Sequence, residues 1–311
     1  MYFTSLPDHS RAGFDERLHF SRFGKTNIVF NATSDAAGCD DHVGCLSIKT
    51  VLSGEEWYRL DGRNVAVRPG QFLVLNDGQA YSCRIISGPV KTVSVFFGRE
   101  FSQAVLHDST SSEEKLLDNP STTGVDAPEF LQTLRGLEGE INEDLSKLIR
   151  SLESEGYESD RVDEHLVFLL GNFIRIHRKD LAASKNILGI KSSTQKEIYK
   201  RVCIARDLLH TYYGERPDLQ SISAASCLSV PQLLRQFKAA FGTTPHRYLT
   251  AIRLQRAAKL LQSTTMHVAD IALSCGFENT SAFGRAFKGE FGIPALKMRI
   301  RLPESPSGDS G

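Results

Sequence analysis

Two segments of the sequence repeat the same pattern of basic, apolar and helix-capping residues 50 positions apart. Each holds an arginine followed by a lysine, Arg235 with Lys238 and Arg285 with Lys288. A guanidinium can donate two hydrogen bonds to O6 and N7 of guanine, and an ammonium can neutralise a phosphate. The repeated residues therefore indicate contact with DNA. The two copies read Ser229-x3-Leu233-x-Arg235-x-Phe237-Lys238-x2-Phe241-Gly242 and Asn279-x3-Phe283-x-Arg285-x-Phe287-Lys288-x2-Phe291-Gly292.

Each copy is predicted to form a helix that buries one face and exposes the other. Ser229 and Asn279 are residue types that cap helix N-termini, and Gly242 and Gly292 stand where helices end. Apolar residues recur at i and i+4, away from the basic residues. The residues before each copy predict a short helix and a tight turn, which includes Cys275-Gly276 in the second copy and is one residue shorter in the first. This order of elements is a helix-turn-helix.

Nine positions on these two helices are the candidate DNA-binding residues. Arg235 and Arg285 can read bases; the alternative for both is a surface ion pair or a contact with phosphate alone. Pro231 and Leu234 offer few hydrogen bonds, so readout by the first helix rests on Gln232 and Arg235. The full set is Pro231, Gln232, Leu234, Arg235, Lys238, Thr280, Ser281, Arg285 and Lys288.

The stretch 245–262 between the two copies predicts one helix, since Pro245 opens it and no later Gly or Pro interrupts it. Two units joined in this way can occupy successive major grooves about 34 Å apart. Arg253, Arg256 and Lys259 are candidates for phosphate contacts, with a solvated helix face as the alternative. For Arg253 a structural role, bonding carbonyl groups between the two units, is also open.

The net charge of zero conceals two opposite halves. Residues 196–302 contain 16 Lys+Arg and 7 Asp+Glu, a net charge of +9, whereas residues 1–195 carry a net charge of −7. Such an asymmetry indicates a nucleic-acid-binding part attached to another domain. No apolar run is long enough for a transmembrane helix, and residues 1–22 lack the apolar core of a signal peptide, so we expect a cytoplasmic protein.

The N-terminal part is predicted to be a β-domain. Short runs rich in Val, Ile, Phe and Tyr alternate with turn signals such as Asp61-Gly62 and Pro69-Gly70. A spacing of about ten residues between turns favours a sandwich or a small barrel. The predicted strands are 27–31, 43–52, 56–60, 64–68, 71–75, 80–85 and 91–98.

A helical region follows a Ser/Thr/Asp-rich loop at 107–128. Its clearest helix, 160–179, carries an apolar stripe at helical spacing, which is either a dimer seam or a face that packs on the chain's own barrel. A linker is expected at 183–194, and the last residues are expected to be disordered. The stripe consists of Val162, Leu166, Leu169, Phe173 and Ile176.

The C-terminal third resembles the AraC/XylS family of bacterial transcription regulators. Three stretches carry the resemblance: Leu233-x-Arg235-x-Phe237-Lys238-x3-Gly242-x2-Pro245, then Arg253-Leu254-x2-Ala257-x2-Leu260-Leu261, then Ile271-Ala272-x3-Gly276-Phe277-x3-Ser281-x-Phe283-x-Arg285-x-Phe287-Lys288-x3-Gly292. The resemblance implies sequence-specific DNA binding, a role as a transcriptional activator, and RNA polymerase as a partner.

The N-terminal half is similar, over fewer positions, to the cupin-like sensory domain of the same family. The matching pattern is Gly54-x3-Tyr58-x3-Gly62-x6-Pro69-Gly70-x2-Leu73-x6-Gln79-x-Tyr81. This resemblance implies a barrel that binds a small-molecule effector and helices that form a homodimer. Five strand aromatics could line such a pocket or belong to the core: Trp57, Tyr58, Phe72, Tyr81 and Phe96.

The triplet Cys39-x2-His42-x2-Cys45 has residue types that can bind zinc or act in redox chemistry. The alternative is that Cys45 is a buried free cysteine at the start of a strand. We favour the alternative, and predict no metal, no cofactor and no enzymatic activity. Gln79-Ala80-Tyr81 occupies the turn where a metal-binding cupin could carry a histidine.

Together these observations predict an α+β protein, with an N-terminal cupin-like β-barrel, appended helices, and a C-terminal all-α domain of two helix-turn-helix units joined by a linker helix. The predicted function is a transcriptional regulator that responds to an effector; alternatively the N-terminal domain only dimerises or binds a partner protein, or the chain is a cupin-type enzyme. The predicted parts are a sensory domain (1–107), a helical dimerisation region (108–185), a linker (186–195), the DNA-binding domain (196–302) and a disordered tail (303–311).

Overall fold

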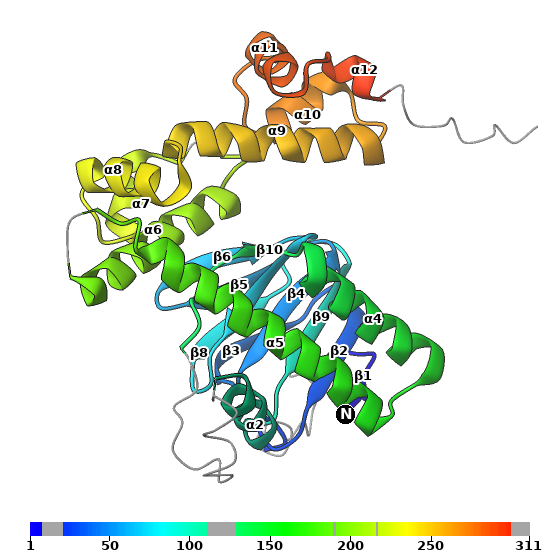
Figure 1. Cartoon of the computed structure of the whole chain (residues 1–311). Coiled ribbons are helices and arrows are strands. Elements are labelled where there is room, and N and C mark those ends of the chain that lie inside the picture. The colour runs from blue at the N-terminus through cyan, green and yellow to red at the C-terminus, as the bar shows by residue number, and fades with distance from the viewer. Residues whose placement is uncertain (8–20, 111–128, 189–190, 216, 300–311) are drawn as a thin grey trace, which may run out of the picture. The chain divides into compact units, whose positions relative to one another are not determined.

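The computed structural model describes residues 1–7, 21–110, 129–188, 191–215 and 217–299. The chain divides into two units, Met1–Lys185 and Asn186–Gly311. The predicted tail at 303–311 and most of the predicted loop at 107–128 lie outside the described residues. Figure 1 shows strands in the first unit and helices in both, which confirms the predicted α+β class.

The first unit contains two β-sheets. One has the strand order β1-β2-β9-β4-β7-β10 and the other the order β3-β8-β5-β6. Most neighbours are antiparallel, as in β4 with β9 and β5 with β8. The strands are β1 (Tyr2–Phe3), β2 (Ile28–Ser34), β3 (Gly38–Val43), β4 (Ser47–Ser53), β5 (Glu56–Leu60), β6 (Arg63–Val67), β7 (Gln71–Leu75), β8 (Ala80–Arg84), β9 (Val90–Phe96) and β10 (Arg135–Gly136).

The tight turns of this unit follow from local sequence. Asp61 and Gly62 both have positive φ, at 49° and 74°, and they join β5 to β6 where Leu60 pairs with Arg63. A two-residue hairpin needs this backbone geometry, and Asp-Gly is one of the dipeptides that adopt it. The predicted turn is therefore confirmed.

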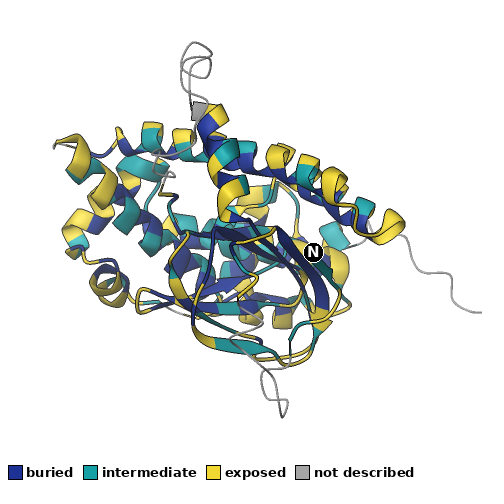
Figure 2. Ribbon diagram, turned by 90° about the horizontal axis from the view of Figure 1, so that it is seen from below, coloured by how far each residue is buried: buried dark blue, intermediate teal, exposed yellow. Residues whose placement is uncertain are grey.

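Side chains of the larger sheet alternate between two cores. On β9, Val93 and Val95 belong to a core shared with the helices, whereas Phe96 belongs to a cluster with Ile28 and Phe30 on the other side. Because successive residues of a strand point to opposite faces, one sheet can support both cores. Figure 2 shows the buried residues gathered along these strands.

Three helices of the first unit share a core with one face of the larger sheet. They are α2 (Arg99–Thr110), α4 (Gly139–Glu155) and α5 (Ser159–Ser184). The stripe predicted as a possible dimer seam lies in this core: Val162, Leu166, Leu169 and Phe173 are each at most 1% exposed, and Ile176 is packed against them. The dimer-seam interpretation of this stripe is corrected, because its side chains are already covered by their own domain.

The second unit consists of helices. They are α6 (Ser192–Thr211), α7 (Leu219–Ala225), α8 (Val230–Phe241), α9 (Pro245–Ser263), α10 (Val268–Ser274), α11 (Thr280–Phe291) and α12 (Ala295–Arg299). Two separate apolar cores hold them: α6, α7, α8 and the start of α9 share one, and the end of α9 shares the other with α10, α11 and α12. This is the predicted arrangement of two helix-turn-helix units on one connecting helix.

Helix boundaries differ from the prediction near the expected linker. Helix α5 continues to Ser184 and α6 begins at Ser192, so both ends of the predicted 183–194 segment are helical. The Ser-Ser-Thr-Gln sequence at 192–195 lacks an apolar repeat of its own. It is helical because it continues a helix whose apolar face, further along α6, is packed in the core. A pattern judged only from these four residues cannot show this.

Three strands were missed by the sequence prediction. Strands β1 and β10 have two residues each. Strand β3, Gly-Cys-Asp-Asp-His-Val, is too polar to look like a strand, and it is stabilised by pairing with β8. The run predicted as one strand from Val43 to Leu52 is divided, because β3 ends at Val43 and β4 begins at Ser47.

Candidate effector pocket and nucleic-acid interface

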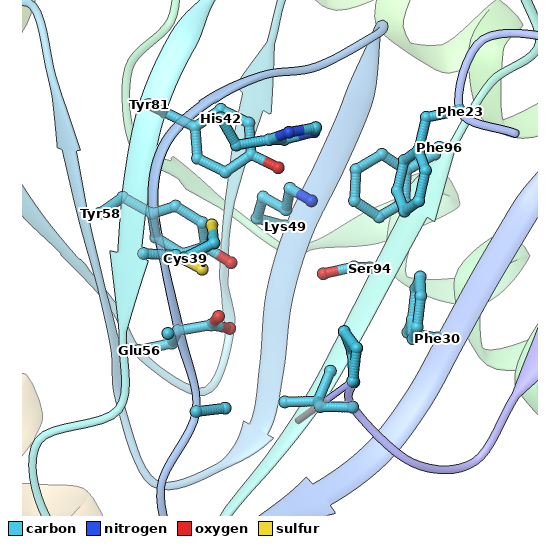
Figure 3. A pocket seen from close by; sticks show the side chains of 15 residues that line it. Phe23, Phe30, Cys39, His42, Lys49, Glu56, Tyr58, Tyr81, Ser94 and Phe96 are labelled. Atoms are coloured by element: carbon cyan, nitrogen blue, oxygen red, sulfur yellow. Dashed lines mark hydrogen bonds between the residues drawn. The ribbon is translucent and has the colours of Figure 1, made fainter. Parts of the chain in front are cut away.

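A pocket opens between the two sheets of the first unit (Figure 3). The space within it, which includes open solvent at its mouth, is about 550 Å³. Aromatic rings form much of the wall, and a few polar groups interrupt them. The lining residues include Phe23, Phe30, Cys39, His42, Lys49, Glu56, Tyr58, Tyr81, Cys83, Ser94 and Phe96.

Lys49 is the cation of this pocket. It lies on β4, is 3% exposed, and holds its Nζ 3.4 Å from the centroid of the Phe96 ring and 5.3 Å from that of Tyr81. Figure 3 shows the amine pointing between these two rings. Burial lowers the pKa of Lys49 to about 8, although nearby Cys83 and Glu56 favour the charged form. The site can therefore offer a cation to a ligand.

Glu56 supplies a carboxyl group to the same pocket from β5. It is 6% exposed, and it accepts a hydrogen bond of 2.8 Å from the hydroxyl of Thr92. Burial raises the pKa of Glu56, while the Thr92 hydrogen bond and the charge of Lys49 act in the opposite direction. The pocket thus has a cation and a carboxyl group in apolar surroundings, an arrangement that can orient a polar ligand.

An irregularity in β3 brings Cys39 and His42 to the same pocket. Their pairing with β8 shifts register between Cys39 and His42, and Asp41 has a φ of 48°. In a regular strand, residues three apart point to opposite faces, but a bulge changes which side chains face inward. The His42 ring lies edge-on to Tyr81, at 5.4 Å between centroids.

Three of the five aromatics predicted for an effector pocket line this one: Tyr58, Tyr81 and Phe96. Phe72 instead lies in the helix-covered core, 5.8 Å from the ring of Phe173. Trp57 is half-buried outside the lining set, and its indole N–H donates to Glu55 at 3.0 Å. The pocket prediction was therefore wrong for Phe72 and Trp57. Successive side chains of a strand point to opposite faces, so Trp57 points away from the side of Tyr58, and Phe72 points away from the side of Leu73.

The predicted triplet Cys39, His42 and Cys45 does not form one cluster. Cys39 and His42 line the pocket, whereas Cys45 is buried beside Ile28 and Phe96, just before β4. Within the described part of the chain, no group of three His, Cys, Asp or Glu side chains has a metal-binding arrangement. The nearest thiol to Cys39 is that of Cys83, on the facing strand.

Lys49, Glu56 and Cys83 were not among the predicted site residues. A signal for them exists in the sequence, because Lys49 interrupts an apolar strand, and Glu56 stands two residues before Tyr58, hence on the same face. Both are charged residues at positions where a strand would be buried, and such residues are often functional. Cys83 gives no comparable signal.

The second unit presents two comparable helices. Helix α8 buries Leu233 and Phe237, and α11 buries Phe283 and Phe287. The opposite faces are exposed and carry every one of the nine predicted DNA-binding residues: Pro231, Gln232, Leu234, Arg235, Lys238, Thr280, Ser281, Arg285 and Lys288.

Both helices have the predicted caps. The Ser229 side chain accepts from the Gln232 N–H, and that of Asn279 accepts from the Ala282 N–H at 2.8 Å. Gln232 also returns a bond, since its Oε1 accepts from the Ser229 N–H at 3.2 Å. This capping box stabilises α8, and it leaves the NH2 group of Gln232 as the part that could read a base.

The connecting helix α9 carries three basic residues with different environments. Arg253 donates from Nε to the Tyr213 carbonyl at 2.8 Å and from Nη2 to the Glu215 carbonyl. This geometry supports the structural alternative for Arg253. Arg256 is partly buried, and Lys259 is exposed.

Among the described helices, none combines the length and apolar character needed to cross a membrane. Two family models match the chain, a helix-turn-helix domain over residues 222–301 and an AraC-like ligand-binding domain over residues 46–159. The first spans both helix-turn-helix units, from within α7 to α12. The second spans β4 to α4, and it includes the pocket residues from Lys49 onward but not Phe23, Phe30, Cys39 and His42.

Two curated relatives each match less than a third of this chain. The HTH-type transcriptional regulator MtrA of Neisseria gonorrhoeae is 40% identical over 82 residues, which are 26% of this chain and 27% of MtrA. The HTH-type transcriptional activator RhaS of Escherichia fergusonii is 38% identical over 91 residues, 29% of this chain and 33% of RhaS. The matched region is thus a third or less of these relatives' length.

Solved structures include a transcriptional regulator of the type containing AraC-type DNA-binding domains, from Chromobacterium violaceum. It is 28% identical, with a TM-score of 0.33, over 38% of this chain and 100% of that one.

Proposed function

The chain belongs to the AraC family of transcription regulators, and from this we propose that it binds specific DNA sites through α8 and α11 and activates transcription in response to a small molecule bound in its β-domain. The observation that carries the proposal is the duplicated helix with a buried aromatic face and an exposed Arg/Lys face. A helix face that is merely solvated does not require the same basic residues in both copies. Two helices that each enter a major groove do require them.

The connecting helix supports simultaneous contact by both units. Helix α9 has 19 residues, which corresponds to about 28 Å at 1.5 Å per residue. Successive major grooves on one side of DNA lie about 34 Å apart. We propose that Arg235 and Arg285 contact bases in two such grooves, while Lys238, Lys288 and Lys259 contact phosphates.

The β-domain pocket supports a ligand with an apolar body and an acceptor group. Aromatic side chains can cover the body, and the ammonium of Lys49 can donate to a carboxylate or carbonyl oxygen. Three predicted residues, Tyr58, Tyr81 and Phe96, contribute to this wall. We propose this pocket as the effector site and assign no catalytic step to it.

Two partners belong to the proposal as well. A second copy of the chain could dock on the outer face of α5, where Val167 and Phe168 are 42% and 57% exposed. We also propose RNA polymerase as a partner, since an activator acts on it, and the bacterial cytoplasm, with the nucleoid, as the location of the chain.

Selection of sites from random double-stranded DNA tests the proposed function. The full chain is used, with the salt concentration fixed and stated, because phosphate contacts make affinity fall steeply with salt. We expect enrichment of two conserved blocks about one helical turn apart. Enrichment of no sequence, with equal affinity for the selected and scrambled pools, would overturn sequence-specific regulation.

The effector site has its own test. Trp57 is the only tryptophan of the chain, and it pairs with Arg84, the neighbour of the pocket residue Cys83. Titration with small carboxylates and carbonyl compounds should change its fluorescence, and calorimetry should show one site per chain that Lys49→Met removes. Binding that survives Lys49→Met unchanged would place the effector elsewhere.

A further inference from the structure

Two cysteines on neighbouring strands lie side by side in the wall of the pocket. Cys39 on β3 and Cys83 on β8 are directly opposite in the antiparallel pairing, and their Sγ atoms are 3.0 Å apart. Opposite residues in such a pair have Cα atoms about 4.5–5.5 Å apart, within the range that disulfides span. A bond of about 2.0 Å therefore requires the sulfur atoms to approach by only about 1 Å.

The surroundings favour a reactive thiolate at one member of the pair. The hydrogen bond from Cys83 is the main reason that the pKa of Cys39 is lowered, and the positive charge of Lys49 lowers it further. The same interaction raises the pKa of Cys83 well above its ordinary value. One sulfur is thus prepared to act as nucleophile while its neighbour keeps a proton.

The pocket offers small molecules a route from solvent to these two cysteines. Cys39 and Cys83 are partly buried residues, and both line the pocket between the sheets. Figure 3 shows Cys39 in this wall. Cys45, on the same domain, is 1% exposed, and burial raises the pKa of its thiol. Reactive cysteines combine thiolate character with access, whereas buried cysteines are inert. Cys39 therefore combines thiolate character with access, whereas Cys45 is buried and protonated.

We propose that Cys39 and Cys83 form a redox-active dithiol, which small hydroperoxides oxidise to a cross-strand disulfide. The Cys39 thiolate attacks the terminal oxygen of the hydroperoxide, breaks the O–O bond and becomes a sulfenic acid. The departing alkoxide or hydroxide takes from solvent the proton that Cys39 released on ionising, and it leaves as an alcohol or water. The Cys83 sulfur then attacks the Cys39 sulfur, its proton passes to the departing hydroxide, and water is released. One peroxide is reduced to two hydroxylic products, and two thiols become one disulfide.

The disulfide would change the pocket itself. It fixes β3 to β8 and replaces the hydrogen-bonded thiols beside Lys49 with an uncharged bridge. Effector affinity would then depend on the redox state, which makes the regulator a sensor of oxidants as well as of its ligand. This consequence rests on the proposed function, whereas formation of the disulfide does not.

Mass spectrometry of the full chain tests the chemistry. The reduced protein carries Cys227→Ser, since Cys227 is the exposed thiol, and is treated with one equivalent of hydrogen peroxide before all free thiols are alkylated. We expect loss of two hydrogen atoms in mass, a crosslinked peptide pair containing Cys39 and Cys83, and full reversal by dithiothreitol. A disulfide between any other pair, or sulfinic acids without a crosslink, would overturn the proposal.

Matched variants separate chemistry from folding. Cys39→Ser and Cys83→Ser should each abolish the crosslink, whereas Cys45→Ser should leave it unchanged. Lys49→Met should slow the crosslink several-fold, because less of Cys39 is thiolate, and Lys49→Arg should restore most of the rate. Equal rates in all three Lys49 backgrounds would refute its role, and the wild-type peptide map decides the crosslink even where a serine variant fails to fold.

The redox and regulatory parts can fail separately. DNA-site selection is carried out on the reduced protein, so its failure removes the proposed function and leaves the disulfide intact. If the site is enriched but no crosslink forms, the regulator stands and the redox inference fails.

Discussion

The guanidinium of Arg253, on the connecting helix, donates to the carbonyl of Tyr213, two residues after the end of α6, with 2.8 Å between Nε and oxygen. The same guanidinium lies against Gly276, in the turn of the second helix-turn-helix unit, where an added Cβ would be 2.8 Å from Nη2 and 2.9 Å from the Gly214 carbonyl. One side chain therefore connects the end of α6, the connecting helix and the second turn.

The first prediction follows from this contact. Gly276 has a φ of 81° and no space for a Cβ, so Gly276→Ala should destabilise the protein by about 1–3 kcal/mol through backbone strain, with additional cost from displacing Arg253. Gly289 lies within α11, and no other atom would lie within 4 Å of an added Cβ. Gly289→Ala should therefore increase the free energy of unfolding, by up to about 1 kcal/mol. Denaturant unfolding of both variants checks this, and equal effects would contradict it.

The second prediction concerns base readout. Arg285→Ala should cost about 1–3 kcal/mol on the selected DNA site and much less on scrambled DNA, if Arg285 pairs with a guanine. Lys196→Ala removes the same charge from an exposed position of α6 and serves as the control. Equal loss on both DNAs for Arg285→Ala would reduce its role to a phosphate contact.

The third prediction concerns the buried lysine. The pKa of Lys49 falls from 10.5 to about 8 on folding, so the unfolded chain binds more protons between these values. The free energy of unfolding therefore increases as pH rises through that window, because the buried lysine loses its charge. Below about pH 8 the folded protein carries the full cost of burying the charged lysine. Lys49→Met should then raise stability at pH 7, by at most about 3 kcal/mol.

This advantage of Lys49→Met should shrink as pH rises from 8 to 10. Glu56, Cys39, Cys83 and Tyr81 also face this space and titrate, so the difference between variant and wild type is the quantity to measure. Lys91→Met, at a half-exposed lysine paired with Glu153, provides the control. A pH-independent gain would show that Met improves packing and that Lys49 keeps its ordinary pKa.

The fourth prediction separates core from interface on α5. Phe173 is 1% exposed, and Phe173→Ala should cost about 3–5 kcal/mol of stability. Phe168 is 57% exposed, and Phe168→Glu should leave stability nearly unchanged while weakening self-association about tenfold or more. Sedimentation across a concentration series checks the second effect. Unchanged association for Phe168→Glu would remove the outer face of α5 as the proposed dimer surface.

The sequence by itself determined the helices of the second unit and most of the strands of the first. Helix caps, turn glycines and apolar residues at i and i+4 act within a few residues of one another, so Ser229, Gly242 and their counterparts could be read directly. The Asp61-Gly62 hairpin is local in the same sense. The exposed faces of α8 and α11 follow from the same periodicity.

Tertiary structure alone decided the pocket. Cys39 and Cys83 are 44 residues apart, and they meet because β3, a strand too polar to predict, pairs with β8 and bulges after Cys39. Lys49 enters the pocket because β4 lies between β9 and β7 in the larger sheet. Likewise the sequence left two alternatives for the stripe on α5, a dimer seam or a face packed on its own barrel, and the structure shows it packed in the core beside the sheet. Pairing and burial between distant segments depend on the whole chain's packing, which local spacing does not encode.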